Sequence, residues 1–426
     1  MVAFSLIFAP SAQAAPFSPK IVVPFLSTTI SGNENDEIIG ITSTKKNWIV
    51  AGNVVGDFLG TTPLNQPDPL TPSGGLDSWV GAFDSSGANV WSLRIGTTED
   101  DVATAIAVDS KEQIWIAGLA QSDKNPTAVT APESSTSAVQ TQPSQTPTVQ
   151  TFNPDSVTAQ TVKPIRKDLK FITVAQIDKN GTLNNRFVAA LKNYGYVTAI
   201  IPDSSGVFLT GIEITKSGGE RSFLQSLSST GEFGQKYYFG KSATTLNSGV
   251  LNKDKTLTLV GNSAEVLAKK SVVGKVDGII LNVSPSDGKI LKILRSSGIG
   301  ATRSWKSAAG NLTVGGTSKT KRLNEGVISQ FSSTGSVLWS KRYAGASAAI
   351  NNLAVVAVLT TQSNSLLKSK AGDLVVYKFD KKGEPTLGGR IPLSAEIIGL
   401  RSQSGLGSCV ATLASDGTFS LAQFPF

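Results

Sequence analysis

Hydrophobic and polar residues alternate along most of the chain in short runs, which are separated by polar turns that contain glycine. Alternation with a period of two indicates a half-buried β-strand, because successive side chains point to opposite faces of a sheet. The clearest run, DVATAIAVDSKEQIWIAG, begins at Asp101, and a related run, DEIIGITSTKKNWIVAG, begins at Asp36. Each contains two strands and the turn between them, so the pattern predicts an all-β protein built from repeated units.

Two series of glycines mark the repeat. One glycine closes the second strand of a unit, and the other lies in the turn between its third and fourth strands. The first series is Gly52, Gly118, Gly211, Gly261 and Gly316. The second series is Gly87, Gly181, Gly231, Gly288, Gly335 and Gly383, spaced by about 50 residues apart from one gap of 94. Four strands in a fixed period of this length are typical of a β-propeller blade, and the series predicts six complete blades.

The two ends of the chain predict how the ring closes. Residues 20–32 look like a fourth strand without its first three, whereas residues 394–426 supply three strands and then stop. Pairing them in a seventh blade would leave no open sheet edge. A second alignment makes the final segment TFSLAQF a fourth strand and changes the blade count by one. We therefore predict a single propeller over residues 16–426, with seven four-stranded blades and an N-terminal strand that completes the last blade.

A long insertion explains the gap of 94. Residues 122–164 lie between the second and third strands of the second blade and are rich in Ser, Thr, Pro and Gln, with no Gly. Because this composition buries too little apolar surface to offset chain entropy, we expect disorder or an extended stalk. Shorter excursions, 57–76 and 263–275, lie at the equivalent place in blades one and four. Such loops leave a propeller on the same rim as the connections between blades, so this rim is the predicted binding face.

Acidic and polar residues in these loops are the candidate binding residues. They are Asn33, Glu34, Asp36, Glu37, Asp57, Phe58, Glu99, Asp100 and Asp101. A pair of such carboxylates could hydrolyse a glycoside. Acidic residues at strand starts more often cap turns, so we predict a binding role for them and no catalytic residue.

The residue inventory argues against most enzyme classes. The chain has no His and one Cys, which excludes Ser-His-Asp and Cys-His nucleophiles and His-ligated metals. Turns such as FDSSG lack the alternating ligands of a calcium loop. Two units, AFDSSGANVW and QFSSTGSVLW, carry Trp four residues after Gly and are similar to the tryptophan docking motif of quinoprotein dehydrogenases. We expect these Trp side chains to wedge adjacent blades together, and we predict no cofactor or metal.

Charge and the first residues bear on the compartment. Residues 1–15 contain an apolar run and end near Ala-Gln-Ala, which fits a signal peptide, although its positively charged start is missing. No other segment reaches the roughly 18 apolar residues of a membrane helix. The net charge of +8 is accompanied by no nucleic-acid motif, so it either serves solubility or attracts an anionic wall polymer, a polysaccharide or a membrane surface outside the cell. We expect a secreted or cell-surface protein.

Two stretches of the chain resemble a known repeat. VWSLRIGTTEDDVATAIAVDSKEQIWIAG and NVVGDFLGTTP look like the bacterial SBBP-type β-propeller repeat. The match is good in blades one and two, partial in blades three to five and poor from Ala346 onward. The resemblance implies a structural repeat of secreted and surface proteins with no single activity, so it assigns no site residues.

The sequence therefore favours a non-catalytic binding or scaffold module for an anionic wall polymer, a glycan or a protein. Two alternatives remain: a secreted carbohydrate-active hydrolase that uses loop carboxylates, and a structural envelope component that binds copies of itself.

Overall fold

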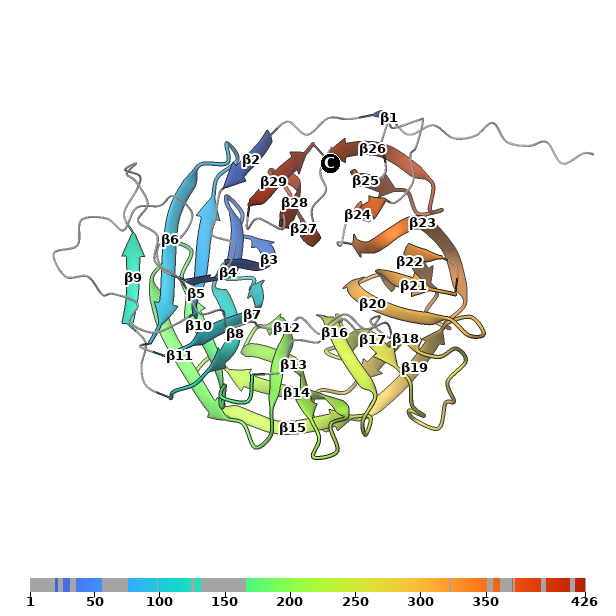
Figure 1. Cartoon of the computed structure of the whole chain (residues 1–426), viewed down its shortest axis with the longest axis horizontal. Coiled ribbons are helices and arrows are strands. Elements are labelled where there is room, and N and C mark those ends of the chain that lie inside the picture. Colours follow the sequence, from blue (N-terminus) through green and yellow to red (C-terminus); the bar gives the residue numbers. More distant parts are fainter. Residues whose placement is uncertain are drawn as a thin grey trace, which may run out of the picture.

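The chain folds into seven four-stranded blades arranged in a ring, as the computed structural model shows (Figure 1). The structure describes residues 20–21, 26–30, 36–55, 76–97, 99–123, 127–131, 166–321, 323–350, 355–360, 370, 372–391, 396–413 and 418–425. Within this part there is no helix long and apolar enough to cross a membrane. The predicted all-β, seven-bladed propeller is confirmed.

The first four blades follow one another along the chain, each with its first strand innermost. Blade 1 comprises β3 (Glu37–Ser43), β4 (Trp48–Val55), β5 (Leu76–Phe83) and β6 (Asn89–Gly96). Blade 2 comprises β7 (Asp101–Val108), β8 (Ile114–Ala120), β10 (Phe171–Ile177) and β11 (Leu183–Ala190). Blade 3 comprises β12 (Gly195–Asp203), β13 (Gly206–Ile214), β14 (Glu220–Ser228) and β15 (Phe233–Phe239). Blade 4 comprises β16 (Thr244–Leu251), β17 (Leu257–Ser263), β18 (Asp277–Val283) and β19 (Ile290–Ser296).

Blades 5 and 6 share a strand. Blade 5 comprises β20 (Thr302–Ala309), β21 (Thr313–Lys319), β22 (Asn324–Phe331) and the first part of β23 (Val337–Ile350). Blade 6 comprises the end of β23 with β24 (Val355–Thr360), β25 (Leu374–Phe379) and β26 (Pro385–Ile391). Because β23 runs on from one blade into the next, no connecting loop with an acidic turn separates them. This continuity explains why the repeat pattern fades from Ala346 onward.

Blade 7 closes the ring through the N-terminal segment. It comprises β27 (Glu396–Gln403), β28 (Gly407–Leu413), β29 (Phe419–Phe424) and β2 (Leu26–Ile30). Strand β2 pairs antiparallel with β29, with Leu26 opposite Gln423. The short strand β1 (Lys20–Ile21) instead pairs parallel with β26 of blade 6. The predicted closing strand is thus confirmed, but the segment 20–32 divides between two blades (Figure 1).

The hydrophobic core lies between the faces of neighbouring blades. Trp48 and Phe83 of blade 1 pack in one buried cluster with Phe419 and Leu421 of blade 7. Cys409 belongs to the same cluster and is fully buried, and its burial raises the pKa of the thiol. Each blade therefore buries its two faces only by stacking on its neighbours.

A bulge in each innermost strand accounts for the glycine of strand two. The ladder between the first two strands of a blade shifts register at this point, as between Leu246 and Ser248 of β16. The bulge pushes a backbone carbonyl against the neighbouring strand. A Cβ atom on Gly261 would stand 1.9 Å from the carbonyl oxygen of Thr245. The close approach of the two backbones leaves room for glycine alone.

A side chain on the outer strand of the preceding blade packs against the glycine in the turn between strands three and four. Trp91 on β6 donates its Nε1–H to the carbonyl of Lys179 at 3.1 Å, and its ring lies against Gly181 in blade 2. The same contact recurs at the next four junctions, between Phe187 and Gly231, Tyr237 and Gly288, Leu294 and Gly335, and Trp339 and Gly383. The expectation that the two Trp side chains wedge adjacent blades together is confirmed.

The ring has two rims, which we name by the connections that they carry. The turn face carries the turns between strands one and two and between strands three and four, and the loop face is the opposite rim.

Within the long insertion, β9 (Thr127–Ala131) adds a fifth strand to the outer edge of β6 (Figure 1). The rest of 122–164 lies largely outside the described residues, as do the candidate signal peptide at 1–15 and the excursion over 57–75. The predictions of disorder and export therefore stay predictions.

Candidate functional site

Asp100 ties two long loops to the connection between blades 1 and 2. The residue is 6% exposed, and its Oδ1 accepts the N–H of Leu76 at 2.8 Å, where the loop of blade 1 ends. Its other oxygen pairs with Arg166, where the insertion of blade 2 ends, and Arg166 also pairs with Asp168. The strand two to three loops and the blade connection thus meet on one rim, as expected.

Asp101 and Asp77 are buried in the same region and are each paired with an arginine. Asp101 accepts hydrogen bonds from the N–H and Oγ1 of Thr97 at 2.7 and 2.6 Å and pairs with Arg186 at 3.2 Å. Asp77 pairs with Arg94 across blade 1. Burial raises the pKa of both carboxyls, that of Asp77 to about 6, although the arginines oppose the shift.

The remaining candidate residues are divided between buried positions and undescribed ones. Asp36 is 5% exposed, and the Glu37 carboxylate accepts the Nδ2–H of Asn53 at 3.3 Å. Glu99 is half-buried. Asn33, Glu34, Asp57 and Phe58 lie outside the described residues. Asp100 and Asp101 therefore stabilise the connection between blades 1 and 2, and the buried Asp36, Asp100 and Asp101 offer little open surface to a ligand.

One buried residue that the sequence analysis missed joins blades 1 and 2. Asn53 is fully buried, accepts the N–H of Ala103 at 2.7 Å and donates to the Ala103 carbonyl at 3.0 Å. Its position directly after the strand-two glycine is the only signal that the sequence offers.

An ion pair recurs at one place in four blades. A carboxylate at or just before the start of strand three pairs with an Arg on strand four, and the Arg follows it by 17 or 18 residues. The pairs are Asp77 with Arg94, Asp277 with Arg295 (3.1 Å), Glu325 with Arg342 (3.2 Å) and Asp373 with Arg390 (3.4 Å). The spacing was a usable signal that the sequence analysis did not exploit.

Blade 3 departs from this arrangement. The ladder places Arg221 where the other blades have the carboxylate, and Tyr238 where they have the Arg. The Arg221 guanidinium lies 3.7 Å from the centre of the Tyr238 ring. Its carboxylate partner is Glu213 on strand two, at 2.9 Å, and Tyr238 also donates its hydroxyl to Glu213 at 2.8 Å. The exchange brings a cation and an aromatic ring to the loop-face end of the blade.

Glu213 is the buried anchor of this group. Glu213 is only 2% exposed, and its carboxylate also accepts the Nδ2–H of Asn193 at 2.5 Å. Burial opposes its charge, but the hydrogen bonds from Asn193, Arg221 and Tyr238 hold its pKa below the usual value. Burial and the adjacent Glu213 raise the pKa of Tyr238 to about 12. The site therefore presents a neutral phenol and a fixed cation over a charged carboxylate.

Two tyrosines and several cations surround this anchor. Tyr238 is 42% exposed and Tyr194 is 40% exposed, with Lys167 Nζ 5.6 Å from the Tyr194 ring. We define the blade 3 tyrosine cluster as Lys167, Lys192, Asn193, Tyr194, Glu213, Arg221, Lys236 and Tyr238. Exposed aromatic faces stack on sugar rings, and the surrounding cations can pair with acidic groups.

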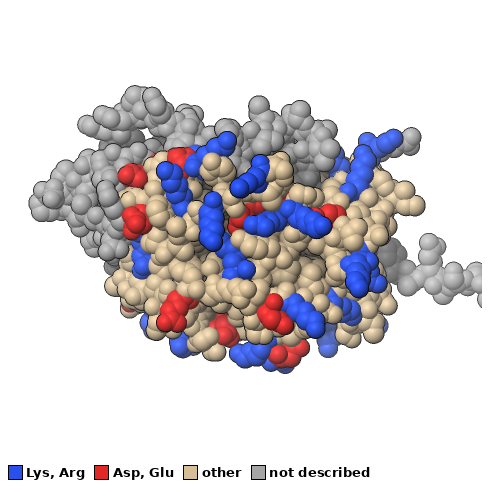
Figure 2. All heavy atoms as spheres, turned by 90° about the horizontal axis from the view of Figure 1, so that it is seen from below, with Lys and Arg blue, Asp and Glu red and all other residues tan. Residues whose placement is uncertain are grey.

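Basic residues extend along this rim. Lys216, Lys241, Lys269, Lys270 and Lys275 are exposed on the loop face of blades 3 and 4. The turn face of these blades carries Asp254, Asp287 and Glu232 among its lysines. Figure 2 agrees: Lys and Arg predominate in the upper half of that view, whereas they alternate with Asp and Glu along its lower edge. The loop face is the more basic of the two.

Glu220 gives this region a pH dependence that can be measured. Its carboxylate accepts the hydroxyl of Thr245 at 3.3 Å, and burial raises its pKa to about 7. Because the folded pKa lies above the unfolded value of about 4.3, Glu220 contributes stability below that value and loses the contribution as pH rises to 7. We expect Glu220→Gln to raise the free energy of unfolding at pH 8 by about 1–2 kcal/mol, after allowance for solvent screening.

Urea unfolding midpoints between pH 4 and 8 test this expectation. The exposed Glu232→Gln should leave the wild-type pH profile unchanged. A Glu220→Gln profile that parallels the wild type would contradict the assignment.

Comparison with known proteins identifies no family for this chain. No family model matches the chain, and no curated protein matches it. Among solved structures, it is similar to a glucose dehydrogenase with 10% identity and a TM-score of 0.37, over 59% of this chain and 92% of that chain. It is also similar to a member of the DUF4221 family from Bacteroides vulgatus, with 9% identity and a TM-score of 0.33, over 59% and 85% of the two chains. Because both TM-scores lie below 0.5, neither likeness assigns a property to this chain.

Proposed function

We propose that the protein is a secreted or cell-surface propeller that binds an acidic polysaccharide without catalysis. The observation that carries the proposal is the blade 3 tyrosine cluster, in which two exposed tyrosines lie among four cations and one buried carboxylate. An acidic sugar offers a ring face for the tyrosines and a carboxylate or sulfate for the cations. Neutral glycans would offer no acidic group to Lys167 and Lys192, the two cations of the cluster that do not pair with Glu213.

Two further observations support parts of the proposal. The carboxylates that a hydrolase would need, Asp100 and Asp101, are buried and engaged by Arg166 and Arg186. The segment 1–15 and the resemblance to the SBBP-type repeat favour an exported protein. Since no family model matches the chain, that resemblance stays a hypothesis.

Binding of the full chain to polygalacturonate, heparin and neutral dextran tests the proposal. We expect binding to the two acidic polymers that weakens with salt, and none to dextran. Tyr194→Ser and Tyr238→Leu should each weaken binding about tenfold, the loss of roughly one stacking contact. Tyr238→Phe is the matched control, because it removes the hydroxyl and keeps the ring.

Several outcomes would contradict the proposal. Equal binding of Tyr238→Leu and wild type would remove the tyrosine cluster from the site. Release of reducing ends from either polymer would favour the hydrolase. Self-association without polysaccharide binding would favour a structural envelope component.

A further inference from the structure

Four exposed aliphatic side chains lie on the loop face of blades 4 and 5. They are Val266 (63% exposed), Val273 (55%), Ile299 (97%) and Leu323 (52%). Val266 and Val273 belong to the loop between β17 and β18, Ile299 to the connection between the blades, and Leu323 to the loop after β21. Single exposed aliphatic residues are ordinary, but four on adjacent loops of one rim indicate an interaction surface.

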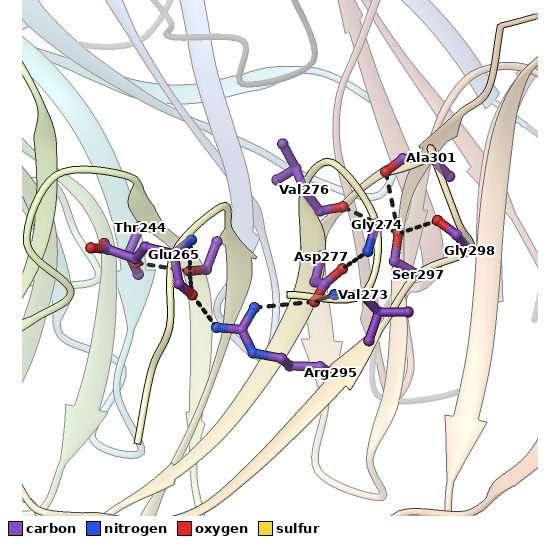
Figure 3. Close-up of polar contacts among 11 residues, drawn as sticks. Thr244, Glu265, Val273, Gly274, Val276, Asp277, Arg295, Ser297, Gly298 and Ala301 are labelled. Carbon is purple, nitrogen blue, oxygen red and sulfur yellow. Dashed lines mark hydrogen bonds and ion pairs between the residues drawn. The ribbon is translucent and has the colours of Figure 1, made fainter. Parts of the chain in front are cut away.

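Three of these residues belong to a single packed unit. Gly274 lies so close to the next connection that a Cβ atom there would stand 2.5 Å from the carbonyl oxygen of Ala301 and 2.9 Å from that of Gly298. The N–H of Lys275 donates to the same Ala301 carbonyl at 2.8 Å. The Ser297 hydroxyl donates to the Val276 carbonyl at 3.2 Å (Figure 3). The loop that carries Val273 and the turn that carries Ile299 are therefore fixed together.

Buried charged groups hold this unit in place. Asp277 accepts the N–H groups of Val273 and Gly274 at 2.9 and 2.8 Å, and Arg295 joins Asp277 to the carbonyl of Glu265 (Figure 3). The Glu265 carboxylate in turn accepts the Thr244 hydroxyl at 2.7 Å and the N–H groups of residues 241 and 243. The loop is anchored at both ends, so its aliphatic side chains are held out to solvent.

The surface around the aliphatic residues is basic. Lys241, Lys269, Lys270, Lys275 and Lys321 are exposed and make no ion pair within the described part of the chain. The carboxylates at the same ends of the strands are already engaged, since Asp277 pairs with Arg295, and Glu325 with Arg342. The positive charge of this rim is therefore largely uncompensated.

The tip of the loop presents two of these lysines. Leu267 and Lys270 form a small antiparallel bridge, and the two residues between them, Ala268 and Lys269, have φ of 43° and 63°. This is the left-handed backbone of a two-residue hairpin turn, which costs free energy in residues other than glycine. The strained turn projects Lys269 and Lys270 beside Val266.

We propose that this rim docks on an anionic lipid bilayer, with Val266, Val273 and Ile299 in the boundary between headgroups and acyl chains. Aliphatic wedges gain free energy on leaving water, and lysines at the same level pair with anionic headgroups. A polysaccharide offers no apolar layer for the aliphatic side chains. An apolar protein partner would leave the surrounding lysines without a counter-charge. This inference is independent of the polysaccharide site in blade 3.

Sedimentation of the full chain with vesicles tests the docking. We expect binding to phosphatidylcholine vesicles that contain phosphatidylglycerol, and little binding to phosphatidylcholine alone. Ile299→Ser should weaken binding about tenfold, and Lys270→Ala about fivefold. The control is Leu291→Ser, which changes a 51% exposed residue on outer strand β19 of the same blade and should bind like the wild type.

A fluorescent label reports the geometry of contact directly. Because the native Cys409 is fully buried, Ile299→Cys can be labelled selectively with an environment-sensitive dye, and Leu291→Cys serves as its control. A blue shift with anionic vesicles at position 299 alone is the expected result.

Equal binding to both vesicle types, equal loss in Ile299→Ser and Leu291→Ser, or equal blue shifts at the two labelled positions would overturn the proposal. Binding to acidic polysaccharide but not to vesicles would leave the blade 3 function intact and refute this one. Vesicle binding that persists in Tyr238→Leu, with polysaccharide binding lost, would separate the two sites.

Discussion

Arg295→Met is expected to lower the free energy of unfolding by about 3–5 kcal/mol, because it leaves the Asp277 carboxylate without its cation. The side chains of Arg295 and Asp277 are 5% and 0% exposed, and their Nη1 and Oδ2 atoms are 3.1 Å apart. Methionine fills a similar volume, so the loss reports the buried charge and not a cavity. Guanidinium unfolding midpoints at constant slope would measure it.

The repeat supplies a matched control for this substitution. Arg342 occupies the same place in blade 5, but its side chain is 49% exposed and its partner Glu325 is 16% exposed. We expect Arg342→Met to cost less than about 1 kcal/mol, as exposed pairs do. The double variant R295M/D277N should regain part of the loss, because no buried charge remains without a partner.

Arg295 also holds the basic loop of blade 4, since it joins Asp277 to the Glu265 carbonyl. Arg295→Met should therefore speed tryptic cleavage after Lys269 or Lys270 under native conditions, whereas Arg342→Met should not. Equal unfolding midpoints for the two variants would show that burial of the Arg295–Asp277 pair does not increase its contribution to stability.

The ring and its closure were readable from the sequence because they depend on local signals. Strand alternation, the two glycine series and the incomplete units at the ends each report a constraint that acts within a few residues. The glycine of strand two, such as Gly261, records a backbone approach that the first five blades repeat. The N-terminal strand was predictable because the last unit visibly lacks one.

The candidate site was less predictable because it depends on long-range pairing. The sequence pattern predicts that Asp100 and Asp101 are exposed loop residues. In the structure both are buried, because Arg166 and Arg186, which follow the long insertion in the sequence, pair with them. The blade 3 cluster becomes visible only when strand register aligns Arg221 and Tyr238 with the ion pairs of other blades. Register fixes which side chains meet, and composition does not contain it.

The structure changes where the search for function should start. The acidic turns that follow the repeat most closely stabilise junctions, whereas the surfaces proposed to bind ligands lie where the blades differ. Blade 3 exchanges the acid and the arginine for an arginine and a tyrosine, and blade 4 carries an anchored loop between strands two and three that is longer than its counterparts in blades 3 and 5. Residues that recur in every regular blade are explained by the fold, so the residues by which blades 3 and 4 differ from the others are the better candidates for ligand binding.

Gly181→Ala is expected to lower the free energy of unfolding by about 3 kcal/mol, through two separable effects. The first is the left-handed backbone, since φ is 88° and a side chain there costs about 1 kcal/mol. The second is overpacking, because the added Cβ would stand 2.7 Å from the Trp91 ring of the preceding blade and force the two blades apart. Denaturant midpoints would measure the total.

Gly218→Ala isolates the first effect. Gly218 has nearly the same φ, 82°, but nothing lies within 4 Å of its added Cβ, so we expect a loss of only about 1 kcal/mol. In a Trp91→Ala background the ring is absent, and the added cost of Gly181→Ala should fall to the same value. The resulting coupling of about 2 kcal/mol would assign the docking of blade 1 on blade 2 to this contact. Equal losses in Gly181→Ala and Gly218→Ala would instead mean that the junction yields to the added methyl group and that the ring does not fix the blades.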